Sequence, residues 1–256
     1  MRNPQIIDQV AGLGFPEALR WHHGALWFSD IFRSRVMSWR PGFAPEVMLD
    51  KSQGGPEMPG GIGWSASGEL IVVDCLKRLV LKRSHAGEIS TFMDLSEHTD
   101  QPLNDMHVDS EGNCFVGGYG FNPESSQPTA SPIYKISPSG QLKISPAEYV
   151  FPNGCEKFGS KLAVAETFAD RVSFFSPDLE RLSVEAFPAG SGPDGLSFDA
   201  AGSVFVAAAF TGCLYKMTES GEPELFYRLE QEQDAPGGTR GIFDCAVHPS
   251  QEYIAF

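Results

Sequence analysis

Four short segments of the chain place an oxygen-bearing side chain a few residues ahead of an apolar run. They are Phe15-Pro16-Glu17, Leu103-Asn104-Asp105, Phe151-Pro152-Asn153-Gly154 and Gly192-Pro193-Asp194-Gly195. Carboxylate and amide oxygens are the ligands that hard divalent cations prefer. If the fold brings these segments together, Glu17 and Asp194 offset the charge of a cation. Asn104 and Asn153 would add neutral oxygens, so the four residues predict one metal site.

The segments recur in phase with an internal repeat. Short apolar runs begin at Ala25, Glu69, Asn113, Lys161, Ser203 and Glu252, so the repeat is 42 to 49 residues long. A turn precedes each run, and most of the turns contain Gly, as tight hairpins prefer. No sustained helical period is visible. Six repeats of three to four short strands predict an all-β, six-bladed β-propeller that forms a single domain over residues 1–256.

Two stacked sandwich sheets are the alternative fold, but they would not explain one motif that recurs at one phase. Residues 5–10 have the pattern of a lone strand ahead of the first repeat. The last repeat ends at Phe256, before any outer strands, and the natural chain could extend further. We expect the N-terminal strand to complete the last blade and close the ring.

The innermost strand of each propeller blade lines a central channel, so equivalent residues at the mouths of these strands converge. Glu17 and Asn153 stand eight residues ahead of their apolar runs, and Asn104 and Asp194 stand nine. Asn-Gly, Asp-Gly and Asn-Asp are also ordinary turn dipeptides, so any single one is more often a turn than a ligand. Agreement between four repeats favours a shared site.

Composition excludes several classes of function. The 256 residues include 19 Lys and Arg against 33 Asp and Glu, a net charge of −14, with no basic run to bind nucleic acid. No segment approaches the roughly 20 apolar residues that span a membrane, and no signal peptide follows Met1. The five cysteines form no Cys-x-x-Cys pair, which indicates buried free thiols in a reducing, cytoplasmic protein.

Together the motifs resemble those of the SMP-30/gluconolactonase/luciferin-regenerating-enzyme-like family over nearly the whole chain. The segments that carry the resemblance are Gly14-Phe15-Pro16-Glu17 with Leu26-Trp27-Phe28-Ser29-Asp30, Asn104-Asp105-Met106 with Val108-Asp109, Pro152-Asn153-Gly154 with Ala165-Glu166-Thr167, and Pro193-Asp194-Gly195. Family members are six-bladed propellers that hold one divalent cation and usually hydrolyse small lactones.

The resemblance also implies roles for single residues. It makes Glu17, Asn153 and Asp194 the metal ligands and places Asn104 at both metal and substrate. Asp194 matches the family's ligand that also serves as general base. We expect Ca²⁺, with Mg²⁺, Mn²⁺ or Zn²⁺ as alternatives. The cation would polarise the lactone carbonyl, and Asp194 would start the attack of water.

The substrate pocket departs from the family pattern. Sugar-lactone members often carry Arg two residues before the Asn of Asn-Asp, where this chain has Pro102, so a donor to sugar hydroxyls is missing. Further on, Tyr119, Phe121 and Asn122 stand where polyol-binding members can place an acid, and they are candidate substrate-binding residues. The two rings could equally be core packing. The substrate we predict is therefore a more apolar lactone or a related ester.

Two other functions stay open. A non-catalytic propeller could use the metal for stability and bind a small ligand or a protein, because fold does not fix function. A lyase or isomerase could use the same cation and base on a related hydroxy acid. No Gly-x-Ser-x-Gly motif supports a nucleophilic serine. The sequence indicates neither the substrate nor the oligomeric state.

Overall fold

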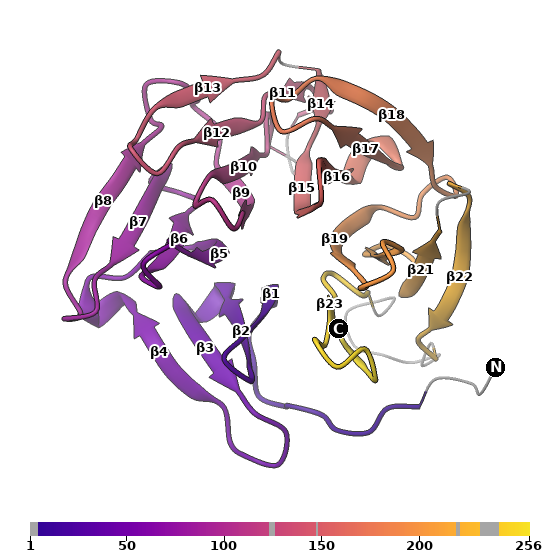
Figure 1. Ribbon diagram of the computed structural model, residues 1–256, viewed down its shortest axis with the longest axis horizontal. Coiled ribbons are helices and arrows are strands. Elements are labelled where there is room, and N and C mark those ends of the chain that lie inside the picture. Colours follow the sequence, from indigo (N-terminus) through magenta and orange to yellow (C-terminus); the bar gives the residue numbers. More distant parts are fainter. Residues whose placement is uncertain (1–4, 123–125, 147, 219–220, 231–240) are drawn as a thin grey trace.

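The computed structural model describes residues 5–122, 126–146, 148–218, 221–230 and 241–256. Its strands form separate antiparallel sheets that follow one another around a central axis, so the protein is an all-β propeller (Figure 1). The helices in the described residues are three short 3-10 turns, η1 (Ile31–Arg33), η2 (Lys51–Gln53) and η3 (Thr167–Ala169). In the part of the chain described, no helix has the length and apolar character needed to cross a bilayer.

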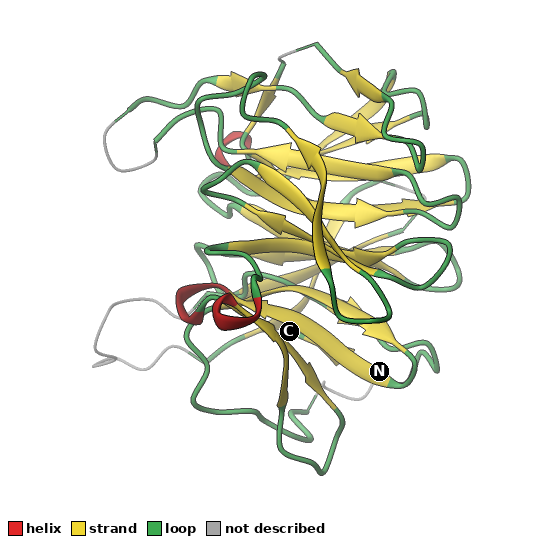
Figure 2. Ribbon diagram, turned by 90° about the vertical axis from the view of Figure 1, so that its left-hand side faces the viewer, coloured by secondary structure: helices red, strands yellow, loops and turns green. Residues whose placement is uncertain are grey.

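Five sheets in the described residues contain four strands each, and each sheet is one blade. Blades 1 to 5, each from the inside outwards, consist of β1 (Pro16–His22), β2 (Ala25–Asp30), β3 (Arg35–Trp39) and β4 (Glu46–Asp50); β5 (Pro59–Trp64), β6 (Leu70–Asp74), β7 (Leu79–Arg83) and β8 (Ile89–Asp94); β9 (Leu103–Val108), β10 (Cys114–Gly118), β12 (Tyr134–Ile136) and β13 (Leu142–Ile144); β15 (Pro152–Phe158), β16 (Lys161–Glu166), β17 (Arg171–Phe175) and β18 (Arg181–Ala186); and β19 (Pro193–Phe198), β20 (Val204–Ala208), β21 (Cys213–Met217) and β22 (Pro223–Arg228). The blades stack as layers when the molecule is seen from the side (Figure 2).

The predicted count of six blades is wrong, because five blades are present in the described residues. The sixth repeat forms only a hairpin of β23 (Ala246–Val247) and β24 (Ile254–Ala255), and β11 (Ala130–Ser131) pairs separately with β14 (Tyr149–Val150). A turn followed by an apolar run defines two strands, so the sequence pattern could not distinguish a hairpin from a blade. Residues 5–10 are not a strand, and the predicted completion of the last blade by them is wrong as well.

The hairpin lies between blade 5 and blade 1, as Figure 1 shows. The Gly195 N–H donates to the Phe243 carbonyl at 2.8 Å, and the Trp21 indole Nε1 donates to the Ala246 carbonyl at 3.2 Å. Ala246 also packs in an apolar cluster with the Leu26 and Phe28 side chains of blade 1. These contacts close the ring between β19 and β1.

Each inner strand of a blade begins with the same irregularity. The pairing register shifts just after the first residues of β1, β5, β9, β15 and β19, where a β-bulge interrupts the ladder. Four of these strands start with proline, which is tolerated at the first residue of a strand. Bulges re-aim side chains, so those of the following residues can turn into the channel.

A hydrogen bond of one kind fixes the loop above each bulge. In all five blades the residue after the second strand donates its N–H to the carbonyl of the residue before the first strand. The pairs are Ile31 and Phe15, Cys75 and Met58, Tyr119 and Pro102, Thr167 and Phe151, and Ala209 and Gly192, at 2.9 to 3.4 Å. Two rings of residues are thereby held around the mouth of the channel.

Apolar side chains fill the spaces between neighbouring blades. Val73 of blade 2 and Val116 of blade 3 lie in one buried cluster, and Ala163 of blade 4 and Val206 of blade 5 lie in another. All five cysteines are buried and free, as the sequence predicted. The core therefore consists of seams between sheets that run from the channel outwards.

Candidate active site

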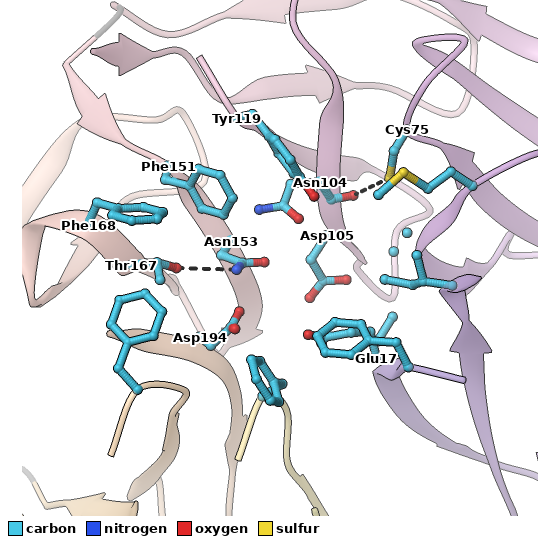
Figure 3. Close-up of a pocket in the computed structure, with 18 residues that line it drawn as sticks. Glu17, Cys75, Asn104, Asp105, Tyr119, Phe151, Asn153, Thr167, Phe168 and Asp194 are labelled. Atoms are coloured by element: carbon cyan, nitrogen blue, oxygen red, sulfur yellow. Dashed lines mark hydrogen bonds between the residues drawn. The ribbon is translucent and has the colours of Figure 1, made fainter. Parts of the chain in front are cut away.

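The oxygen-bearing side chains meet in a cavity of about 210 Å³ where the inner strands begin. Glu17, Asn104, Asn153 and Asp194 all line this cavity, although they come from blades 1, 3, 4 and 5. Figure 3 shows their side chains, together with Asp105, turned toward a common centre. The convergence that the repeat phase predicted is therefore present in the structure.

Each of the two asparagines has its amide nitrogen held by a hydrogen bond. The Asn153 Nδ2 donates to the Thr167 hydroxyl at 3.2 Å, and the Asn104 Nδ2 donates to the Pro152 carbonyl at 3.5 Å. With the nitrogens engaged, the amide oxygens are left for the cavity (Figure 3). The cavity therefore receives two neutral oxygen acceptors at fixed positions.

Asp194 is the least satisfied acid of the site. It is 5 % exposed, and its Oδ1 is buried with no hydrogen-bond partner within the described residues. Burial, together with repulsion from Asp244 and Asp105, raises the pKa of Asp194 well above its usual range. A buried anion without a partner is costly, so this oxygen has the character of a ligand for a cation or a proton acceptor.

Glu17 has a similar environment. Burial raises the pKa of its carboxyl well above the usual range, and the nearby Asp194 and Asp244 carboxylates raise it further. Two acids that disfavour each other's ionisation are stabilised when a divalent cation lies between them. The residues present therefore fit a divalent cation, with Glu17, Asn104, Asn153 and Asp194 as the donors.

Two further acids lie beside this set, and the sequence motifs did not single them out as site residues. Asp105 lines the cavity and accepts from Arg20 Nη2 at 3.0 Å, and Asp244 Oδ2 lies 3.7 Å from Arg20 Nη1. The backbone N–H of Leu19 also donates to Asp244. Asp105 follows Asn104 directly and so could have been found, whereas no repeat signal marked Arg20 or Asp244.

Arg20 begins a second polar layer deeper in the channel. The residues three positions after Glu17, Asn104, Asn153 and Asp194 are Arg20, His107, Glu156 and Ser197. Burial and the charge of Arg20 lower the pKa of His107 to about 3, so this imidazole is neutral. Burial raises the pKa of Glu156 against the opposing effect of Arg20. The floor of the cavity is therefore a buried network with Arg20 as its main cation.

Among described residues, no group of three or more His, Cys, Asp and Glu side chains is arranged to hold a metal ion. The predicted donor set is of another kind, because two of its four members are amides. Its acids come from β1 and β19, and its amides come from β9 and β15. A site of this composition suits a hard cation such as Ca²⁺ or Mg²⁺ better than a soft one.

The walls of the cavity are mostly apolar and aromatic. They include Phe15, Ile31, Met58, Tyr119, Phe151, Phe168, Phe210 and Phe243. Of the described residues that line the cavity, none is Lys, Arg or His. A ligand therefore meets oxygens at the floor and hydrocarbon at the sides.

The predicted substrate-binding residues are divided by the structure. Tyr119 lines the cavity and packs against Phe151 with ring centroids 4.5 Å apart. Phe121 is buried behind the wall against Phe151 and Phe168, and Asn122 is exposed outside the cavity. Phe121 and Asn122 are therefore not lining residues, because only the first residue after β10 is held at the channel mouth.

The sequence profile of the SMP-30/gluconolactonase/LRE-like region matches residues 15–230. The chain belongs to this family. The match includes all four predicted metal-site residues and the bulged starts of β1, β5, β9, β15 and β19. No curated protein matches at a significant level.

Solved structures of the SMP-30/gluconolactonase/LRE-like type have the same fold. A gluconolactonase from Xanthomonas campestris is 18% identical, with a TM-score of 0.74 over 94% of this chain and 82% of that one. Regucalcin from Agrobacterium tumefaciens, a calcium-binding protein, is 15% identical, with a TM-score of 0.74 over 94% and 81%. A luciferin-regenerating enzyme is 18% identical, with a TM-score of 0.72 over 93% and 81%. At these identities the similarity establishes the fold alone.

Proposed function

We propose that this protein is a divalent-metal-dependent hydrolase of a small lactone. Membership of the gluconolactonase-like family supports the reaction class. The observation that carries the proposal is the convergence of Glu17, Asn104, Asn153 and Asp194 on one cavity, with Asp194 Oδ1 lacking a protein partner. When bound, the cation, with Ca²⁺ as our first expectation, would supply Lewis-acid polarisation of the lactone carbonyl.

Asp194 is the general base in this proposal. Its ionised carboxylate takes a proton from the attacking water, whose oxygen bonds to the carbonyl carbon. The bond between the carbonyl carbon and the ring oxygen then breaks, and the ring oxygen takes up the proton. The product is an open-chain hydroxy acid. Asn104 stands beside Asp105 at the cavity and would orient the ring.

Other nucleophiles of the cavity are poorly suited to this reaction. Burial, together with the charges of Asp74 and Asp105, raises the pKa of the Cys75 thiol, so the reactive thiolate is scarce. Burial also raises the pKa of the Tyr119 phenol. Attack by water, with Asp194 as its base, is the reaction that these residues favour.

The test is turnover of a panel of lactones before and after treatment with EDTA, followed by addition of Ca²⁺, Mg²⁺ or Mn²⁺. Activity that is lost with EDTA and returns with one cation supports the proposal. Metal binding without turnover of any lactone would contradict hydrolysis and would favour a non-catalytic, ligand-binding propeller.

We also propose that the preferred lactone is aliphatic or aryl-substituted rather than a sugar lactone. Pro102 uses its carbonyl to hold Tyr119, its side chain does not line the cavity, and the lining has no basic residue among those described. Loss of one charge-assisted hydrogen bond to a hydroxyl costs roughly 1.5–3 kcal/mol, or about 10- to 150-fold in selectivity. Values of kcat/KM on matched ring sizes test this, and gluconolactone as the best substrate by about tenfold would contradict it.

A further inference from the structure

Exposed apolar residues recur at one position of the propeller repeat. They stand two residues after the second strand of blades 1, 2, 4 and 5, and they are Phe32, Leu76, Phe168 and Phe210. Each is exposed by more than a third, at 73%, 48%, 39% and 47% respectively. Only Phe168 and Phe210 also line the cavity. They are therefore the two described lining residues that reach both the site and the solvent.

Phe168 and Phe210 form one surface at the mouth between blades 4 and 5. Their ring centroids are 5.7 Å apart, and Phe168 lies 5.0 Å from the Phe151 ring in the wall. Phe210 packs over Gly192, where an added Cβ would lie 2.5 Å from the Phe210 ring. The two rings are thus held in place in the free protein, and Gly192 leaves the room for one of them.

The cavity below this surface is too small for a large ligand. Its volume of about 210 Å³ lies below the roughly 300–1,000 Å³ of pockets that enclose a drug-sized molecule. A lactone ring fills most of this space, so a substituent on the ring has to leave through the mouth. Every other lining residue is at least partly covered, which leaves the Phe168 and Phe210 rings as the exposed apolar exit.

We propose that Phe168 and Phe210 bind an apolar tail of the substrate outside the cavity, while its lactone ring lies over the acids and amides. The substrate class is then a lactone with a linear alkyl or aryl substituent of several carbons. The proposal rests on the proposed function for the identity of the ring. The tail site itself stands on the exposure, contacts and position of the two phenylalanines.

The experiment uses the full chain loaded with Ca²⁺ and a series of δ-lactones with linear alkyl substituents beside the ring oxygen. Full burial of a methylene changes a binding constant about fourfold, so on half-exposed rings we expect kcat/KM to rise about twofold per carbon. The rise should stop once the chain passes the two rings. In Phe168→Ala and Phe210→Ala the rise per carbon should fall, and Phe168→Leu should restore much of it.

Leu76→Ala is the matched control, because Leu76 occupies the same repeat position and is exposed but does not line the cavity. It should keep the wild-type dependence on chain length. An equal dependence in wild type, Phe168→Ala and Phe210→Ala would overturn the proposal, and so would an equal loss in Leu76→Ala.

Binding of the corresponding alkyl lactams, measured by calorimetry, separates this proposal from the proposed function. If no lactone is hydrolysed but lactam affinity rises with chain length and depends on Phe168 and Phe210, the tail site stands and hydrolysis fails. If lactones are hydrolysed and neither kcat/KM nor lactam affinity responds to chain length, the tail site fails alone.

Discussion

Asp194 and Glu17 show at the scale of single residues why the floor of the cavity suits a cation. Both carboxyls are buried, both are close to other acids, and both have raised pKa values for these reasons. The one positive side chain nearby, Arg20, already contacts Asp105 and Asp244. The charge of Glu17 and Asp194 therefore depends on a partner from outside the chain.

Glu17→Gln should weaken binding of the cation, because it removes one of the two donor carboxylates and keeps the shape of the side chain. At an effective dielectric constant of about 20, a unit charge a few ångströms away contributes about 4 kcal/mol, so we expect at least a tenfold loss of Ca²⁺ affinity. Calorimetric titration measures it. Glu46→Gln, an exposed change on β4, is the control and should leave the affinity unchanged.

The effect of Ca²⁺ on thermal stability should depend on pH. Burial and neighbouring acids raise the pKa values of Glu17 and Asp194, and burial raises that of Asp244 to about 7. The stability linked to these retained protons is present below about pH 4, where the unfolded carboxyls titrate. It is lost as pH rises through the folded values, when the metal-free acids must ionise together.

A cation that binds the ionised acids restores this loss. The rise in Tm caused by Ca²⁺ should therefore be larger at about pH 8 than at about pH 5.5, by about 2–4 °C for each additional kcal/mol. Protonation of His107 in the unfolded chain affects both samples equally and cancels in the difference. An equal rise at both pH values would show that these acids do not hold the ion.

At the residue scale, the sequence predicted more about the floor than about the walls. The four donors were found because their spacing repeats with the strands, and spacing along a strand is local information. Phe121 and Asn122 were placed at the pocket from their position after an apolar run alone. Whether a side chain two or more residues past a strand faces the channel depends on the loop, which the hydrogen bond from Tyr119 to Pro102 decides.

At the scale of elements, the inner strands can converge because glycine follows several of the donor residues. A Cβ at Gly154 would lie 2.4 Å from the Asp194 carbonyl oxygen of the neighbouring strand. A Cβ at Gly195 would collide with the Asp244 carboxylate. These positions need glycine for close approach of two backbones, so Asn-Gly and Asp-Gly here are packing motifs as well as donors.

Gly154→Ala should therefore destabilise the protein by about 3 kcal/mol or more, because backbone must move. Gly140→Ala is the matched comparison, since Gly140 has φ +82° but open space around its Cβ position. That change should cost only about 1 kcal/mol. Unfolding in urea measures both, and similar losses in the two variants would contradict the close approach of β15 and β19.

The repeat also predicted the strands better than their assembly. Turns and apolar runs predicted the first two strands of every blade, because both signals are local. The β-bulges were not predicted, since they depend on how Pro16, Pro59, Pro152 and Pro193 start strands that face one another. The bulges are nevertheless what turns the donor side chains into the cavity.

At the scale of the whole molecule, the ring depends on contacts between segments far apart in the sequence. Arg20 on β1 contacts Asp105 on β9, donates to the Met106 carbonyl at 3.1 Å and lies near Asp244 at the closing hairpin. The Arg20 side chain is 16% exposed. One guanidinium therefore joins blade 1, blade 3 and the closing segment beneath the site.

Arg20→Ala should destabilise the protein by about 3–5 kcal/mol, because it leaves two buried carboxylates without their cation. Arg20→Lys keeps the charge but loses the planar fork, so it should recover only part of the loss. Chemical denaturation checks this order of stability. Equal stability of wild type and Arg20→Ala would show that the network beneath the cavity does not hold the ring together.

The number of blades was the main error of the sequence prediction. Six apolar runs recur, but the last one pairs only within the hairpin of β23 and β24. Ring closure was expected from an N-terminal strand, whereas the contacts that close the ring come from Phe243, Asp244 and Ala246. These contacts join residues more than two hundred positions apart, which no local pattern reveals.

The central claim is that one divalent cation binds among Glu17, Asn104, Asn153 and Asp194, and anomalous scattering from crystals grown with Mn²⁺ tests it most directly. We predict one strong anomalous peak in the cavity, with oxygens of Glu17, Asn153 and Asp194 at bonding distance. The peak should be absent from an Asn153→Ala, Asp194→Ala double variant. No peak in the cavity of the wild type, or full occupancy in the double variant, would contradict the account.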